Sequence, residues 1–142
     1  MGTVWDPTLE IGHAEIDGQH REVFRRYEAL VEVMEAGTAG DLTELFEFLG
    51  SYAVEHFSGE ERLMTATRYP GAKVHAAAHA RFVREYAELV ELWRANGTTH
   101  GVAVKTRTWI GDWLRTHISV VDMALVRFLR ARRSAAETPP PA

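Results

Sequence analysis

Histidines on apolar helix faces are the chemically unusual feature of this 142-residue chain. Seven ionisable residues fall on stripes of otherwise apolar residues that recur with the helical period. These residues are His20, His56, Glu60, His75, His79, His117 and Asp122. Burying so many ionisable groups in one small core is costly unless each gains a strong partner. A bound metal ion supplies that partner, so the set predicts a buried metal centre.

Two pairs within this set have the spacing expected of ligands on one helix. His56 and Glu60 are four residues apart, as are His75 and His79. On an α-helix such residues lie one turn apart and differ by only about 40° around the axis. Each pair can therefore converge on one point inside a helical bundle.

The third pair does not fit an ideal α-helix. His117 and Asp122 are five residues apart, which corresponds to about 140° around the helix axis. A local widening of the helix would bring them together, and such bulges are frequent at functional sites. We therefore expect a helical irregularity near residues 117–122.

The ligand types narrow the choice of metal. The chain has no cysteine, so five imidazoles and two carboxylates form a nitrogen and oxygen donor set that suits iron or manganese. Suppose that both carboxylates and one oxo or hydroxo group bridge two octahedral ions. One coordination position then stays vacant, and a small exogenous ligand could occupy it.

Three further ionisable residues have alternative interpretations. Glu61 competes with Glu60 as a ligand, but it lies about 140° around the helix from His56. We therefore prefer Glu60 and interpret Glu61 as a surface residue or as a support for a ligand. His13 and His100 are expected to be exposed loop histidines, with a place beside the channel to the open metal as the alternative for His13.

Composition excludes several classes of function. The chain is 46% hydrophobic and 25% charged, as is usual for a globular protein. Its formal net charge is −4, so it lacks the excess of positive charge that nucleic-acid binding requires. Without cysteine it has neither disulfides nor thiolate metal ligands. The first ten residues lack the features of a secretory signal, and no apolar run suffices for a membrane span. We therefore expect a cytoplasmic protein with no membrane or nucleic-acid partner.

Four segments carry apolar residues at helical spacing, namely 16–34, 42–64, 74–93 and 109–129. Pro70 suits the first residue of the third helix, and Asn96-Gly97 suits its end. Short connections and the lack of strand-like alternation predict an all-α, up-down-up-down four-helix bundle over residues 16–133. Residues 1–15 are expected to form an irregular arm, and residues 134–142 a disordered, proline-rich tail.

The arrangement resembles the hemerythrins, and specifically the single-domain bacterial type. The resemblance covers about residues 5–130 and is carried by several matching segments. These are Trp5, Gly12 and Ile16-Asp-Gly-Gln-His20; His56-Phe-Ser-Gly-Glu60-Glu-Arg-Leu-Met64; Tyr69-Pro-Gly71 with His75-Ala-Ala-Ala-His79 and Phe82; and Trp113-Leu-Arg-Thr-His117-Ile118 with Asp122.

The resemblance implies two non-haem iron ions, Fe2+ or Fe3+, joined by an oxo or hydroxo bridge. The implied ligands of the coordinatively saturated iron are His75, His79 and His117. The iron with the vacancy would be held by His20 and His56. The implied bridging carboxylates are Glu60 and Asp122.

The resemblance also implies reversible binding of dioxygen, for carriage, storage or delivery. Reversibility requires a pocket without water. By similarity Trp113 and Leu114 line that pocket, with Phe57 and Ile118 as weaker candidates. An oxygen-consuming enzyme or a reductase is a further implied partner.

Three other functions compete with oxygen binding. Di-iron oxidases and peroxidases use Glu-x-x-His motifs on bundle helices, but the sole such motif here, Glu10 to His13, precedes the first helix. The histidine-rich donor set favours milder chemistry, so we expect a binding protein with at most weak redox activity. A sensor would require a separate partner protein. A structural zinc site would leave several ligands unused, because zinc is usually four-coordinate.

Overall fold

The computed structural model describes residues 10, 14–37 and 42–137, and these residues are almost entirely helical. Its helices are α1 (Ala14–Glu35), α2 (Thr43–Thr67), α3 (Ala72–Asn96) and a long fourth helix with three consecutive segments. These segments are α4 (His100–Trp113), the π-helix η2 (Leu114–Asp122) and α5 (Met123–Glu137). Within the described residues there is no strand, so the predicted all-α class is confirmed.

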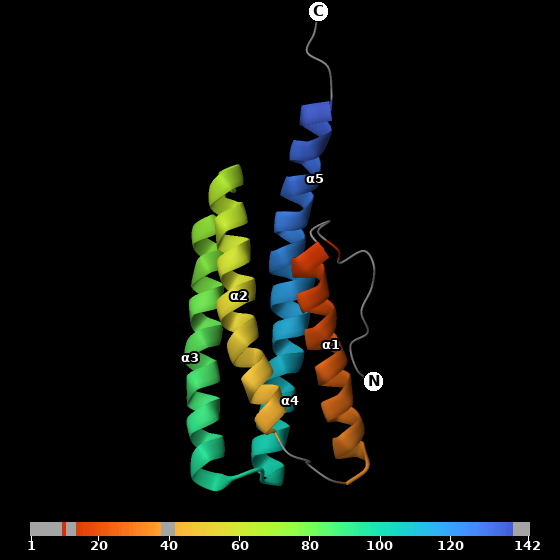
Figure 1. Ribbon diagram of the computed structural model, residues 1–142, viewed down its shortest axis with the longest axis vertical. Helices are drawn as coiled ribbons and strands as arrows, with labels where there is room; N and C mark the ends of the chain where they lie inside the picture. The colour runs from red at the N-terminus through yellow and green to blue at the C-terminus, as the bar shows by residue number, and fades with distance from the viewer. Residues whose placement is uncertain (1–9, 11–13, 38–41, 138–142) are drawn as a thin grey trace, which may run out of the picture.

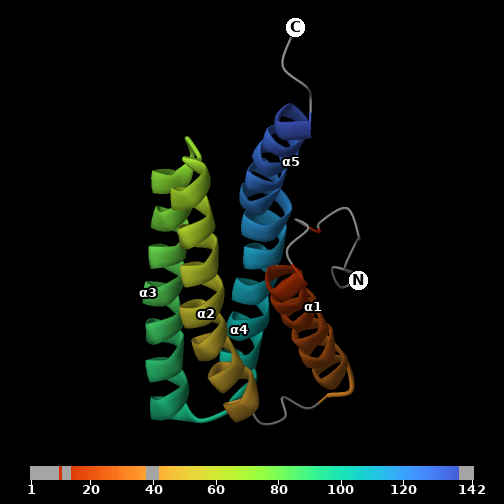
Figure 2. The ribbon, with the colours of Figure 1, turned by 45° about the horizontal axis from the view of Figure 1, so that its top comes forward.

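The four helices form a closed ring of antiparallel neighbours (Figures 1 and 2). Helix α1 contacts α2 and α4, and α3 contacts the same two helices. This is the predicted up-down-up-down bundle. As a result, the beginnings of α1 and α3 lie at the same end of the bundle as the end of α2.

The helix ends lie at or near the positions predicted from the sequence, with three small differences. Helix α3 ends at Asn96 as expected, where Gly97 adopts a φ of 75° that glycine tolerates without strain. It begins at Ala72 rather than at Pro70, with Gly71 as its N-cap. The first helix begins at Ala14, inside the predicted arm. Helix α5 continues to Glu137, so residues 134–137 of the predicted tail are helical.

The rest of the predicted arm and tail cannot be compared with the structure. Trp5, Gly12 and His13 lie outside the described residues, as do residues 138–142. No helix in the described part of the chain is long and apolar enough to cross a membrane.

Apolar side chains from all four helices fill the bundle interior. The fully buried members include Phe24, Leu49, Phe82, Ile110 and Leu114. Each such side chain stabilises the fold by about 1.5–3 kcal/mol relative to an exposed position. This packing fixes the helices against one another and thereby positions the polar side chains at one end of the bundle.

Candidate metal centre

All seven predicted ligand residues lie inside the bundle. None has more than 2% of its surface exposed. They come from all four helices: His20 from α1, His56 and Glu60 from α2, His75 and His79 from α3, and His117 and Asp122 from η2. Because α1 and α3 begin at the end of the bundle where α2 ends, the N-terminal halves of α1 and α3 lie beside the C-terminal half of α2 there.

The seven residues form two groups whose ligand atoms are within reach of one ion each. The three-histidine group consists of Glu60, His75, His79 and His117. The two-histidine group consists of His20, His56, Glu60 and Asp122. Within each group the ligand atoms lie within 4.8 Å of one another. Glu60 belongs to both groups, so the two candidate ion positions are neighbours.

The π-helix brings His117 and Asp122 together. Both residues are buried although they are five apart, and η2 covers this interval. In a π-helix the hydrogen bonds run between residues five apart, so such residues lie close along one side. The irregularity that the spacing predicted is therefore confirmed. Ser119 adds a side-chain hydrogen bond over the same interval, donated from Oγ to the carbonyl of Leu114 at 2.9 Å.

Asp122 faces both groups with different oxygens. Its Oδ1 atom lies 3.1 Å from Nε2 of His117 and 2.9 Å from Nε2 of His75. Its Oδ2 atom lies 3.0 Å from Nε2 of His20. A carboxylate in this position can give one oxygen to each of two ions.

Glu60 also lies between histidines of both groups. Its Oε1 atom is 3.0 Å from Nε2 of His56, 3.2 Å from Nε2 of His79 and 3.6 Å from Nε2 of His75. Its Oε2 atom is buried and has no hydrogen-bond partner among the described residues. A buried carboxylate oxygen without a partner is costly, so this atom is suited to a metal ion.

Two of the imidazoles have partners on the side away from the centre. The Nδ1 atom of His56 lies 2.8 Å from Oε1 of Gln19, and Nδ1 of His79 lies 3.2 Å from Oε2 of Glu61. Because each partner atom is an oxygen that can only accept, Nδ1 donates the hydrogen bond in both rings. Such contacts fix the orientation of a ligating imidazole and raise its basicity.

These two partners refine the sequence interpretation. Glu61 is half exposed on its side chain and contacts a ligand candidate instead of joining either group. The preference for Glu60 over Glu61 therefore agrees with the geometry. The role of Gln19 was missed, and its position directly before His20 was the available signal.

The donor set fits a pair of iron ions. The Nε2 atoms of His20 and His56 lie only 2.9 Å apart, and Nδ1 of His117 has no hydrogen-bond partner in the described structure. Imidazole nitrogens that face one another this closely inside a protein are typical of a metal site, because a metal ion can bind both of them. Imidazole and carboxylate donors without sulfur match iron or manganese.

Burial and the carboxylates act in opposite directions on the imidazoles. Burial lowers the pKa of His75, but the hydrogen bonds that it donates to Asp122 and Glu60 outweigh burial and raise this pKa to about 9. At His117 burial prevails and the pKa is lowered. Burial would raise the pKa of Asp122, yet the charges and hydrogen bonds of His117, His20 and His75 hold it well below its usual value. The metal-free cluster therefore holds protons that a metal ion must displace.

The four predicted pocket residues are all buried next to the centre. They are Phe57, Trp113, Leu114 and Ile118. The ring of Phe57 stacks on His79 with centroids 4.0 Å apart, and that of Trp113 stacks on His117 at 3.8 Å. Both imidazoles belong to the three-histidine group. Aromatic rings therefore cover two of the three imidazoles of this group.

Tyr52 is a further buried neighbour of the centre. Its ring lies nearly parallel to that of His56, 4.7 Å away, and its hydroxyl oxygen accepts a hydrogen bond from Nε1 of Trp113 at 3.2 Å. The spacing of four residues before His56 was the signal that could have revealed it.

Comparison with known proteins agrees with this fold and donor set. Residues 12–129 match the family model described as the hemerythrin HHE cation-binding domain. A bacteriohemerythrin from Stenotrophomonas maltophilia is 28% identical over 90% of this chain and 82% of its own length. Hemerythrin subunit 2 of Golfingia vulgaris is 29% identical over 84% and 86%, and a myohemerythrin of Sipunculus nudus is 28% identical over 84% and 87%.

The fold and the donor set define a helical-bundle protein with a two-ion, non-haem metal site. The chain belongs to the hemerythrin family. It is similar over most of its length to bacterial members, and the matched domain is described as cation-binding.

Proposed function

We propose that this protein binds dioxygen reversibly at two iron ions and serves as a carrier or store of oxygen. The observation that supports this most directly is the pair of buried donor groups that share Glu60. When bound, two ferrous ions supply the electrons that hold dioxygen and take them back on its release. All other parts of the function fall to the chain's own residues.

The two ions would receive unequal numbers of imidazole ligands from the protein. His75, His79 and His117 offer three imidazoles to one ion, whereas His20 and His56 offer two to the other. Glu60 and Asp122 face histidines of both groups and would hold the ions together. The ion with fewer imidazoles is left with room for an exogenous ligand.

The surroundings favour binding over turnover. Phe57, Trp113, Leu114 and Ile118 are buried around the centre and keep water away from it. Oxygen bound in such surroundings is protected from proton-driven conversion to peroxide. Delivery to an oxygen-consuming partner is consistent with the same site.

One cycle of reduction and oxygenation tests the proposal. Purified protein should contain two irons per chain. It should be reduced under anaerobic conditions, exposed to oxygen and then evacuated, with absorption spectra recorded at each stage. We expect the oxygenated spectrum to appear and to revert under vacuum over repeated cycles. One iron per chain, stoichiometric zinc, or steady oxygen consumption without a reversible spectrum would refute the proposal.

A further inference from the structure

A chain of aromatic rings connects the candidate metal centre with the protein surface. Trp113 lies parallel to His117, with centroids 3.8 Å apart and an interplanar angle of 8°. Phe82 lies 4.6 Å from Trp113, and Trp109 lies 4.6 Å from Phe82. Trp113 and Phe82 are buried, whereas Trp109 is half-buried. Three ring contacts therefore lead from a predicted iron ligand to a ring that solvent reaches.

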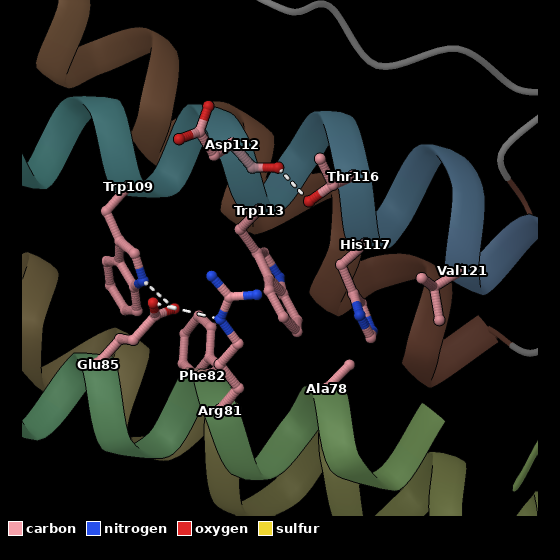
Figure 3. A pocket seen from close by; sticks show the side chains of 10 residues that line it. All are labelled: Ala78, Arg81, Phe82, Glu85, Trp109, Asp112, Trp113, Thr116, His117 and Val121. Carbon is pink, nitrogen blue, oxygen red and sulfur yellow. Dashed lines mark hydrogen bonds and ion pairs between the residues drawn. The ribbon is translucent and has the colours of Figure 1, made fainter. Parts of the chain in front are cut away.

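The aromatic chain lines a pocket between α3 and the fourth helix, here called the α3–α4 pocket (Figure 3). Its volume is about 420 Å³, which lies in the range of sites for small molecules. Phe82, Trp109, Trp113 and His117 all contribute to its lining. A molecule in the pocket would thus lie against the aromatic chain itself.

Charged side chains at the pocket hold Trp109 in place. The Nε1 atom of Trp109 donates to Oε1 of Glu85 at 3.3 Å, and Nε of Arg81 donates to Oε2 of the same carboxylate at 3.4 Å. Most of the Arg81 side chain is exposed, so its guanidinium can also contact an anionic group of a visiting molecule. The aromatic rings suit a planar aromatic molecule, and because the lining also holds the acids Glu85 and Asp112, a negative charge on that molecule would have to lie at Arg81.

The proposed iron centre requires a source of electrons, and a molecule bound in this pocket can supply them. Iron that binds oxygen reversibly loses activity whenever it is oxidised, and the seven predicted ligands are at most 2% exposed. Of the seven, only His117 lines the α3–α4 pocket, so electrons from a molecule in solution must cross protein atoms from the pocket wall to reach the iron. Electron tunnelling falls steeply with distance and is faster through packed atoms than across gaps, which favours the aromatic chain as the route.

We propose that the α3–α4 pocket binds a reduced flavin, and that electrons pass from it along Trp109, Phe82, Trp113 and His117 to the oxidised iron pair. Each dihydroflavin gives two electrons, one to each ferric ion. It leaves as oxidised flavin and releases two protons to solvent. The inference rests on the proposed function, since it assumes that the centre holds iron that must be kept ferrous.

Binding is tested first, with flavin mononucleotide as the probe. Stacking on tryptophan quenches flavin fluorescence, so titration with the oxidised, iron-loaded protein should give saturable quenching. Trp109→Leu should weaken this binding about tenfold, which is the effect of losing one stacking contact. Trp93→Leu is the matched control, because Trp93 donates to Thr98 and packs on Phe46 away from the pocket. It should bind the probe like the unmodified protein.

Electron transfer is tested second, by mixing oxidised protein with photoreduced flavin mononucleotide under anaerobic conditions. The reduction rate should saturate with flavin concentration and should fall several-fold in Trp109→Leu but not in Trp93→Leu. Iron content and circular dichroism confirm that each variant is folded and loaded. Non-saturable quenching, or an equal reduction rate in both variants, would overturn the proposal. Loss of reversible oxygenation with flavin binding intact would instead refute the proposed function.

Discussion

The ring nitrogen Nδ1 of His56 lies 2.8 Å from the side-chain oxygen of Gln19, a residue on a different helix. This contact joins α1 to α2 at the edge of the metal centre and orients one of the two imidazoles of the two-histidine group. Because His56 donates the hydrogen bond, Nε2 is left without a proton and is ready to bind an ion. The contact ties the packing of two helices to the affinity of the centre.

Gln19→Leu removes this acceptor and keeps a side chain of similar size. We expect metal affinity to fall about 10- to 100-fold, as is typical when the outer partner of a ligating histidine is lost. The measurement is the rate of iron loss to a chelator. Gln19→Glu keeps an acceptor at the same position and should retain iron. Equal iron loss in both variants would show that the hydrogen bond does not matter.

Asp122→Asn tests the bridging geometry. An amide presents a single oxygen, so it cannot give one carboxylate oxygen to each ion as the positions of Oδ1 and Oδ2 suggest. We expect fewer than two irons per chain by metal analysis. Asp112→Asn is the control, since Asp112 is exposed and pairs only with Arg115 among the described residues. Two irons per chain in the Asp122 variant would contradict the bridging assignment.

The stability of the metal-free protein should depend on pH through His75. Its folded-state pKa of about 9 lies above the ordinary value of 6.5, so the protonated form stabilises the fold. This contribution is fully present below about pH 6.5 and is lost as the pH rises through about 9. Urea unfolding of the metal-free protein between pH 6 and pH 10 measures it, and His75→Gln should remove this part of the slope. An unchanged slope in the variant would refute the assignment.

Leu114→Asn tests whether the dry surroundings protect bound oxygen. Leu114 is fully buried, and an amide in its place would attract water and protons to the centre. We expect faster conversion of the oxygenated to the oxidised form, followed by absorption spectra. Leu125→Asn is the matched control, because Leu125 is equally buried in α5 outside the predicted pocket. Both variants should lose stability, but faster oxidation in both would mean that the effect is not specific to the pocket.

The helical spacing of residues in the sequence was enough to predict most of the candidate metal centre. Residues four apart share one face of any α-helix, so the inward direction of His56 with Glu60 and of His75 with His79 needed no tertiary information. The misfit of His117 and Asp122 to that period was equally local, and it predicted the π-helix that the structure contains. The four apolar stripes likewise determined the class of fold.

Contacts between helices were decided only by the tertiary structure. The partners Gln19 and Glu61, the stacking of Phe57 on His79, and the placement of the two Asp122 oxygens beside histidines of different helices depend on how far each helix is rotated and shifted against its neighbours. A periodic pattern gives the inward face of one helix but not that register. The α3–α4 pocket is a product of the same register, because its walls come from residues about thirty positions apart in the chain.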